Sequence, residues 1–225
     1  MTAADSTPAF PVTERSRIRR EHDKGSYARA DVHAVLDAAP IAHIGHVIDG
    51  APYVTPTLHW RDGDRLFWHG SAASRFLREA VSAPVCLTCS LIDGYVLARS
   101  IFNHSVNYRS VMVFGTAHLI EDEAEKTAAL RSFADGLFPD RWDSLRTMTA
   151  QELKATSVMW MDIEEATVKA RSGPPADGAE EGHVQVWAGV LPLRTEWSVP
   201  LPAPELPDTI PFPEALARVI ARPRP

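Results

Sequence analysis

The chain has 225 residues, 45% of them hydrophobic, and a formal net charge of −6 at pH 7 with an isoelectric point near 5.8. This length supports one hydrophobic core, and the acidic balance gives no general basic field, so we expect no nucleic-acid partner. Because no apolar run approaches the roughly 20 residues that cross a bilayer, and residues 1–11 do not resemble a secretory signal, we expect a cytoplasmic protein with no membrane partner.

The first half of the chain predicts a short helix followed by closely spaced strands. Residues 1–13 are expected to be disordered, and the charged segment 14–24 is interpreted as a solvated arm. Asp31 is typical of a helix N-cap, and Asp49-Gly50 is typical of a tight hairpin turn. The expected segments are a helix from Asp31, strands at 41–47, 51–60 and 65–69, and a helix at 72–81.

The second half predicts further strands and two helices. Asp93-Gly94 is expected to be a turn between two strands, and Gly115 to kink a long one. Asp122 is expected to cap a helix that Pro139 closes. The expected segments are strands at 85–92, 95–99, 105–120, 157–171 and 183–190, and helices at 122–138 and 150–155.

Six or seven short strands separated by turn signals predict a mainly β fold. We expect an antiparallel barrel, closed or nearly closed, decorated by two to four helices. Residues 14–193 are expected to form this domain. Nine of the 18 prolines follow Leu191, so residues 194–225 are expected to wrap over the surface as a Pro-rich extension that adds no strand.

Cys86 and Cys89 are the only cysteines, and their spacing resembles that of a redox or metal pair. The run around them predicts a strand, however, and residues three apart on a strand point to opposite faces. Zinc would also need two more ligands nearby. We therefore interpret both as small strand residues, and His43 and His46 are excluded as a metal pair for the same reason.

The segment Phe67–Leu77 predicts an anion site, because it combines a strand, a Gly/Ser turn and a helix start. A helix start offers unpaired N–H groups and a partial positive charge. Small residues let an anion approach closely, and Arg75 adds a charge and a fork of donors. We interpret this turn as a phosphate site, with a surface ion pair at Arg75 as the alternative.

Six short motifs follow one another along the chain: Arg19-Arg20, Asp49–Pro56, Phe67-Trp68-His69-Gly70 leading to Ser74-Arg75, Asn107–Val111, Lys169–Pro174 and Trp187–Pro192. In this order they resemble the flavin-nucleotide-binding split barrels related to pyridoxamine 5'-phosphate oxidase. The branch that they resemble includes the 5-nitroimidazole-resistance proteins. The resemblance implies a split barrel that forms a homodimer, with FMN in a groove between the subunits.

The resemblance also implies which residues meet the flavin. They comprise a strand beside the ring, residues that line the ring or hold the phosphate, and an aromatic residue from the partner subunit. The strand beside the ring is Thr55, Pro56, Thr57 and Leu58. The residues that line the ring or hold the phosphate are Trp68, His69, Gly70, Ser74 and Arg75. The aromatic residue from the partner subunit is Trp187.

One departure affects the phosphate site. The oxidases proper usually have Ser-Arg-Lys where this chain has Ser74-Arg75-Phe76, so one basic residue is missing. Arg109 or the Arg19-Arg20 arm would have to supply a second cation.

Three of these residues keep alternative roles. His69 could cap the barrel, or be an axial haem ligand, since some split barrels bind haem. Arg109 could pair with a carboxylate instead of a phosphate. Trp187 could pack in the core under the C-terminal tail.

The sequence contains no recognisable Ser/His/Asp constellation and no Walker loop. That is consistent with flavin chemistry, in which the cofactor transfers electrons and the protein orients it. We therefore predict an FMN-dependent oxidoreductase that transfers hydride or electrons to or from a small molecule. The alternative is a flavin or haem carrier without turnover. Pyridoxamine 5'-phosphate oxidation is a third hypothesis, for which no second phosphate-binding cluster is identifiable.

Overall fold

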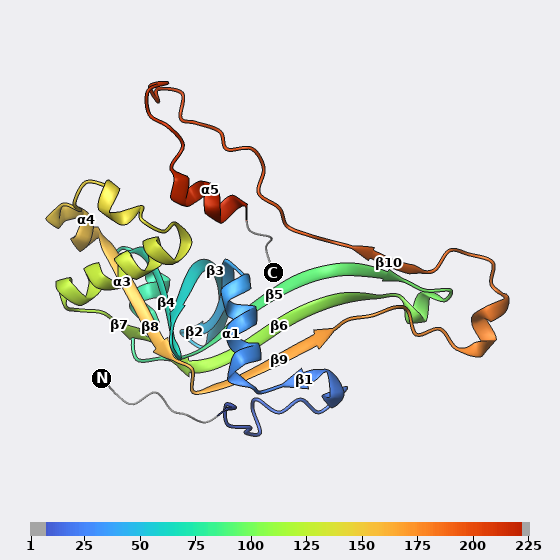
Figure 1. Cartoon of the computed structure of the whole chain (residues 1–225). Helices are drawn as coiled ribbons and strands as arrows, with labels where there is room; N and C mark the ends of the chain where they lie inside the picture. The colour runs from blue at the N-terminus through green and yellow to red at the C-terminus, as the bar shows by residue number, and fades with distance from the viewer. Residues whose placement is uncertain (1–7, 222–225) are drawn as a thin grey trace.

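The computed structural model describes residues 8–221, in which one strongly curved sheet carries helices on both faces (Figure 1). The strands are β1 Gly25–Ser26, β2 Ile41–Ile48, β3 Ala51–Asp62, β4 Arg65–Ser71, β5 Pro84–Leu97, β6 Ser105–Thr116, β7 His118–Leu119, β8 Thr156–Asp162, β9 Glu165–Arg171 and β10 Gly189–Pro192. The α-helices are α1 Arg29–Ala38, α2 Arg75–Glu79, α3 Glu123–Leu137, α4 Ala150–Ala155 and α5 Glu214–Ile220. Short 3-10 helices are η1 His22–Lys24, η2 Ile101–Asn103, η3 Trp142–Ser144 and η4 Ala179–His183.

All strand pairs are antiparallel, in the order β1-β9-β6-β5-β2-β3-β4-β8-β7, with β10 added beside β5. This is the expected mainly β split barrel with helices. The ten strands within residues 8–221 exceed the six or seven expected, because short edge segments pair with the long strands. The five α-helices of this described part of the chain also exceed the expected two to four.

Strand β5 differs from the sequence prediction at its centre. Asp93-Gly94 was expected to be a turn, but the strand continues through it with a register shift between Ile92 and Gly94. A Cβ at Gly94 would lie 2.8 Å from the carbonyl oxygen of Leu191 in β10. Glycine therefore permits the close approach of β10, a long-range contact that no local turn signal contains.

The core lies between α1 and the concave side of the sheet. Its fully buried side chains include Val32 and Leu36 of α1 and Trp68 of β4. At Gly115 a Cβ would lie only 2.4 Å from the Asp162 carbonyl oxygen, so β6 passes directly against the end of β8 there. Strand β6 ends just after this crossing, and the chain pairs again as β7. The single strand expected at 105–120 is therefore divided into β6 and β7.

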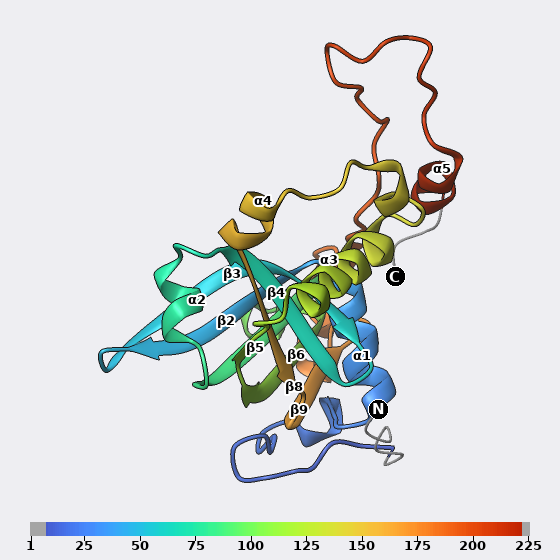
Figure 2. The ribbon, with the colours of Figure 1, turned by 90° about the vertical axis from the view of Figure 1, so that its left-hand side faces the viewer.

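Helix α3 covers the outer side of β4 and β8 (Figure 2). Asp122 caps it as expected, since its Oδ1 accepts a hydrogen bond from Glu125 N at 2.8 Å. Its buried residues join a second apolar cluster, separate from the core around α1. That cluster contains Trp60, Ile120, Ala129, Leu130 and Val158.

The N-terminal segment is more ordered than expected within the described residues. Phe10 is 2% exposed, and Ala9 forms a β-bridge with Ala28. Farther along, Thr167 Oγ1 donates to the Ser16 carbonyl at 2.5 Å. The expectation of disorder is therefore wrong for residues 8–13, since burial of Phe10 stabilises that segment; residues 1–7 lie outside the described residues.

Two extensions leave the barrel (Figure 1). One is the long ribbon of β5 and β6 with β9 and β10 alongside. The strand expected at 183–190 is wrong for residues 183–188, because His183 ends the 3-10 helix η4 and pairing with β5 begins only at Gly189. The other is the Pro-rich segment after β10, which loops away and returns as α5. Within residues 8–221, no helix is long and apolar enough to span a membrane.

Candidate functional site

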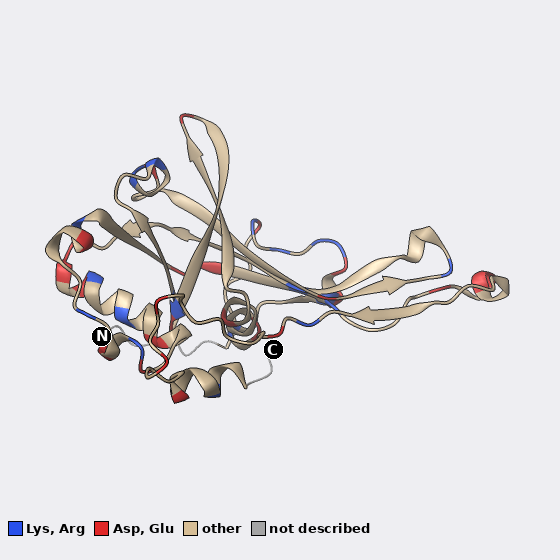
Figure 3. Cartoon of the chain, turned by 90° about the horizontal axis from the view of Figure 1, so that it is seen from above, with Lys and Arg blue, Asp and Glu red and all other residues tan. Residues whose placement is uncertain are grey.

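The outward side of strands β2, β3, β5 and β6 forms an uncharged surface, here called the open face. The register aligns His43 with both Pro56 and Thr88, and Thr88 with Met112, while alternate residues such as Ile44 are buried. The open face contains no Lys, Arg, Asp or Glu, and Figure 3 shows the strands largely tan. Its residues are Ile41, His43, Gly45, Val47, Pro52, Val54, Pro56, Leu58, Cys86, Thr88, Ser90, Ile92, Tyr108, Ser110, Met112 and Phe114. At one margin the Arg15 guanidinium lies 4.4 Å from the centre of the Phe114 ring.

The four residues expected beside a flavin ring lie on β3 but do not share one face. Pro56 and Leu58 belong to the open face. Thr55 pairs with the buried Ile44, so Thr55 and Thr57 point to the opposite side. Only the backbone of this strand and two of its side chains are therefore available on the open face.

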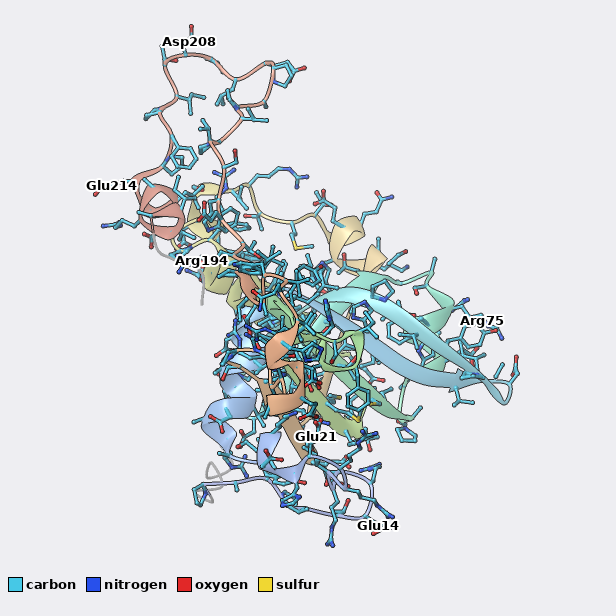
Figure 4. All side chains as sticks on the ribbon, turned by 90° about the vertical axis from the view of Figure 1, so that its right-hand side faces the viewer. Glu14, Glu21, Arg75, Arg194, Asp208 and Glu214 are labelled. Atoms are coloured by element: carbon cyan, nitrogen blue, oxygen red, sulfur yellow. The ribbon has the colours of Figure 1, made fainter. Side chains whose placement is uncertain are left out.

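Arg75 occupies the turn where the sequence predicts phosphate. Its Nη2 lies 2.7 Å from Asp49 Oδ2, and both side chains are largely exposed. Figure 4 shows Arg75 at the margin of the molecule, near the tip of the β2–β3 hairpin. In the single chain Arg75 therefore forms the surface ion pair that the sequence left as the alternative. Such an exposed pair stabilises the fold by at most about 1 kcal/mol.

The helix after this turn is shorter than expected. Helix α2 spans five residues instead of the ten expected, and Ser74 is its N-cap without a side-chain cap hydrogen bond. A Cβ at Gly70 would lie 3.0 Å from Leu77 Cδ1, so glycine lets α2 pack close to β4. A five-residue helix has a weak dipole, so any anion here would depend mainly on the Arg75 side chain.

Trp68 and His69 are neighbours that point to opposite sides of β4. Trp68 is fully buried in the core, and its Nε1 has no hydrogen-bond partner among residues 8–221. In this arrangement it packs as a core residue. The His59–Trp68 pairing places His69 on the outer side, at the level of Leu58 on the open face.

His69 lies in an aromatic environment. Its ring centroid is 5.0 Å from that of Phe133 in α3 and 5.8 Å from that of Trp60. Its Nδ1 is buried and has no hydrogen-bond partner within the described chain. Burial lowers the pKa of His69 from its ordinary value, so the imidazole is neutral at neutral pH. A neutral imidazole with an unpaired nitrogen suits a metal centre.

His59 is a buried histidine that the sequence analysis did not single out. Its Nε2 lies 3.1 Å from the carbonyl oxygen of Leu36 in α1, while its Nδ1 has no hydrogen-bond partner in the described part of the chain. Burial lowers the pKa of this residue too. In the sequence, His59 could be recognised only as a histidine at an inward position of a strand. Strand alternation alone does not distinguish such a histidine from an ordinary core residue.

Arg109 pairs with a carboxylate, the alternative left open by the sequence. Its Nη2 lies 2.7 Å from Asp93 Oδ1 and its Nε 3.0 Å from Asp93 Oδ2. The hydrogen bonds that Arg109 donates to Asp93 raise the pKa of Arg109. Arg109 is aligned with Leu91 on the side of the sheet that α1 covers, so the fold does not bring it to the open face or to Arg75.

The remaining expected residues also lie apart from the β4 turn. Trp187 is 63% exposed and precedes β10 on the long ribbon, so it does not pack in the core of the single chain. Arg19 forms an ion pair with the exposed Glu14. Neither it nor Arg109 supplies a second cation beside Arg75 in this arrangement.

Cys86 and Cys89 lie on opposite sides of β5, at the open face and in the core respectively. Burial raises the pKa of the Cys89 thiol to about 12. At pH 8 only about one such thiol in ten thousand is ionised, and the thiolate is the reactive form.

We therefore expect Cys89 to resist iodoacetamide at pH 8 in the native protein and to react readily in urea. Peptide mass spectrometry after timed labelling measures both rates. Native labelling of Cys89 as fast as in urea would contradict the placement of this residue.

Residues 28–170 match the family model described as pyridoxamine 5'-phosphate oxidase. The chain belongs to this family. The match confirms the resemblance drawn from the six motifs and places the chain among flavin-binding split barrels. No curated protein matches the chain.

Two solved structures are similar over nearly the whole chain. The flavocytochrome Anf3 from Azotobacter vinelandii is 44% identical, with 94% of this chain and 98% of that one covered and a TM-score of 0.88. The FAD- and haem-binding protein from Mycobacterium smegmatis is 36% identical, with 88% and 97% covered and a TM-score of 0.82.

A third similar structure shows the shared fold alone. It is a protein from Bacteroides thetaiotaomicron described as a 5-nitroimidazole antibiotic resistance protein. It is 22% identical, with 64% of this chain and 85% of that one covered and a TM-score of 0.54.

Proposed function

We propose that this chain is a cytoplasmic homodimer that binds a flavin nucleotide and a haem and transfers electrons between these groups and a small molecule. The observation that carries the proposal is the 44% identity to a flavocytochrome over 94% of the chain. The 36% identical relative, whose title names FAD and haem, supports it. Two unpaired cysteines agree with a reducing compartment.

The open face supports the dimer. Val54 is 66% exposed and Val47 62% exposed, and the charged residues lie at the margins of the face, with Asp49 and Arg75 at the hairpin tip and Lys169 of β9 beside Ser110. Exposed apolar side chains on a largely uncharged face are typical of a protein–protein contact. We infer that two copies meet there and that the flavin ring lies between them, beside the backbone of β3.

The surroundings of His69 fit a haem. The residue is neutral, has a buried unpaired ring nitrogen and lies among aromatic side chains at the edge of the open face. We therefore infer that His69 is the residue that would hold the haem iron. His59 is the less suitable candidate, because its Nε2 already bonds to the Leu36 carbonyl.

Flavin and haem would supply two-electron and one-electron exchange when bound. The chain's own residues would bind and orient them. His69 would hold the iron, the β3 backbone would contact the polar edge of the ring, and the apolar open face would exclude water from the site. This division of labour needs no protein residue as general base.

The absorbance spectrum of the purified protein tests the proposal. Flavin bands together with a Soret band are expected, and mass spectrometry of the heat-released cofactor distinguishes FMN, expected from the family motifs, from the FAD named for the M. smegmatis relative. Bleaching of the bands by a reductant and recovery with a quinone or nitroaromatic compound would support electron transfer. Flavin bands without a Soret band would leave the simpler flavin-dependent oxidoreductase, and neither band after reconstitution would refute the proposal.

Arg75→Ala is expected to weaken flavin-nucleotide binding roughly tenfold to a hundredfold, because it removes a charge-assisted contact worth about 1.5–3 kcal/mol. For this contact Arg75 must leave Asp49, which an exposed pair does at little cost. Fluorescence titration measures the change.

The matched control is Asp49→Asn, which releases Arg75 and is expected to leave binding unchanged or stronger. Riboflavin, which lacks the phosphate, should bind the wild type and Arg75→Ala with equally low affinity. Equal affinity of wild type and Arg75→Ala for both FMN and FAD would remove Arg75 from the site.

A further inference from the structure

The long ribbon that leaves the barrel presents a row of uncharged side chains, here called the ribbon stripe (Figure 1). The stripe consists of Tyr95 of β5, Val106 of β6, Leu191 of β10 and Trp187, which precedes β10. Tyr95 is 50% exposed, Leu191 51% and Trp187 63%, whereas Val106 is partly buried. Exposed apolar side chains gathered in one place mark a contact surface more often than single ones do.

The strand register places the ribbon stripe on the same side of the sheet as the open face. Val106 precedes Tyr108, a member of the open face, by two residues, so both point to one side. Tyr95 is aligned with Val106, and Leu191 with Tyr95. The register shift leaves Asp93 as an extra residue of β5, and this bulge turns Tyr95 to the open side. The stripe therefore continues the open face along the same two strands.

Trp187 lies on this side of the ribbon as well. Gly189 is aligned with Leu97 and comes two residues before Leu191, so a Cβ at Gly189 would point to the stripe side. Such a Cβ would lie 2.9 Å from the Trp187 ring. Glycine therefore lets the indole lie directly against the backbone of β10, which fixes its place in the stripe.

The opposite side of the ribbon is covered by the chain itself. Val96 is 1% exposed and Asn107 is 8% exposed, and Asn107 Nδ2 donates to the Gly173 carbonyl at 3.1 Å. In the same loop after β9, the largely buried carboxylate of Asp177 accepts a hydrogen bond from Arg99 N at 3.0 Å. The loop thus packs one side of the ribbon, while the apolar stripe on the other side stays exposed.

We propose that the ribbon stripe packs against a second copy of this chain, as the outer part of the subunit interface. The inference rests on the proposed dimer, because the stripe continues the face through which that dimer forms. Apolar and aromatic side chains without charged neighbours are typical of the buried centre of such interfaces. An anionic lipid surface is disfavoured, since the acidic Glu180 and Glu181 of η4 lie at the far end of the ribbon (Figure 3).

Leu191→Glu tests the contact by placing a charge in the stripe. We expect the dissociation constant of the dimer to rise about a hundredfold, because a two-fold interface would bury two such charges. Sedimentation over a range of protein concentrations measures the constant. Leu145→Glu, at a leucine of similar exposure outside the ribbon, is the matched control and should dimerise as the wild type does. A dimer that Leu191→Glu does not weaken would refute the inference.

A milder variant guards against misfolding of Leu191→Glu. Leu191 and Leu145 are 51% and 48% exposed in the single chain, so cysteines at the two positions would be similarly accessible there. In the dimer we expect Leu191→Cys to react with N-ethylmaleimide at least tenfold more slowly than Leu145→Cys, and in urea equally fast. Peptide mass spectrometry separates both from the native Cys86 and Cys89. Equal rates in the native dimer would overturn the proposal.

The outcomes distinguish this inference from the proposed function. A wild-type protein that sediments as a monomer would refute the proposed dimer, and the ribbon contact with it. A wild-type dimer in which Leu191→Cys reacts freely would refute the ribbon contact alone. Neither measurement uses flavin or haem absorbance, so the cofactor proposal is tested separately.

Discussion

His69→Ala is expected to remove the Soret band while the flavin bands persist. The imidazole is the group proposed to hold the haem iron, and alanine removes that group. We expect haem content to fall to less than about a tenth of that of the wild type, because even loss of an outer-shell partner typically costs a metal site 10–100-fold in affinity. The pyridine haemochrome assay measures haem, and circular dichroism checks that the fold is retained.

The pH dependence gives a further check on His69. Burial lowers its pKa below the ordinary 6.5, so the neutral form persists as the pH falls through that value. Haem retention should therefore decline only at more acidic pH. The same lowered pKa means that His69 contributes stability above pH 6.5 that is lost on acidification through the lowered value.

His22→Ala is a suitable control, since His22 is exposed on η1 and distant in the chain from β4. It should leave the Soret band unchanged. A Soret band that persists in His69→Ala and disappears in His59→Ala would transfer the ligand assignment to His59.

Met112→Arg is expected to dissociate the dimer and release the flavin. Met112 is 43% exposed on β6 and is aligned with Thr88 on the open face. A buried unpaired charge costs several kcal/mol, and a two-fold interface would contain two such charges. We therefore expect association to weaken roughly a thousandfold or more. Analytical ultracentrifugation should show a wild-type dimer and a variant monomer of 24.8 kDa.

Ala128→Arg, an exposed position on α3, is the matched control and should remain dimeric with full flavin content. A wild-type protein that sediments as a monomer with flavin bound would contradict the proposed interface. So would a Met112→Arg variant that keeps both its dimer and its flavin.

Local signals determined much of the architecture. Alternation along β5 placed Cys86 and Cys89 on opposite sides, and the Asp49-Gly50 signal positioned the β2–β3 hairpin, where Asp49 has a φ of +52°. Asp122 caps α3 as its sequence context indicates. These features depend on residues a few positions apart, so the sequence contains the whole interaction.

The partners of the candidate site residues were decided by tertiary structure. Arg75 pairs with Asp49 across 26 positions, and His59 bonds to Leu36 across 23. A motif specifies that an arginine or histidine is present, but not which of many carboxylates or carbonyls the fold brings within 3 Å. The same limitation left the phosphate and carboxylate roles of Arg109 equally open until β6 placed it beside Asp93.

The sequence by itself determined the family, the antiparallel β class and the turns, because each depends on residue order or on short-range patterns. Only the tertiary structure decided that β5 continues through Gly94, that Phe10 is buried, and that an uncharged face remains exposed. Each of these arises where segments distant in the chain meet. The free energy of such contacts depends on which surfaces the closed sheet brings together, which no local pattern contains.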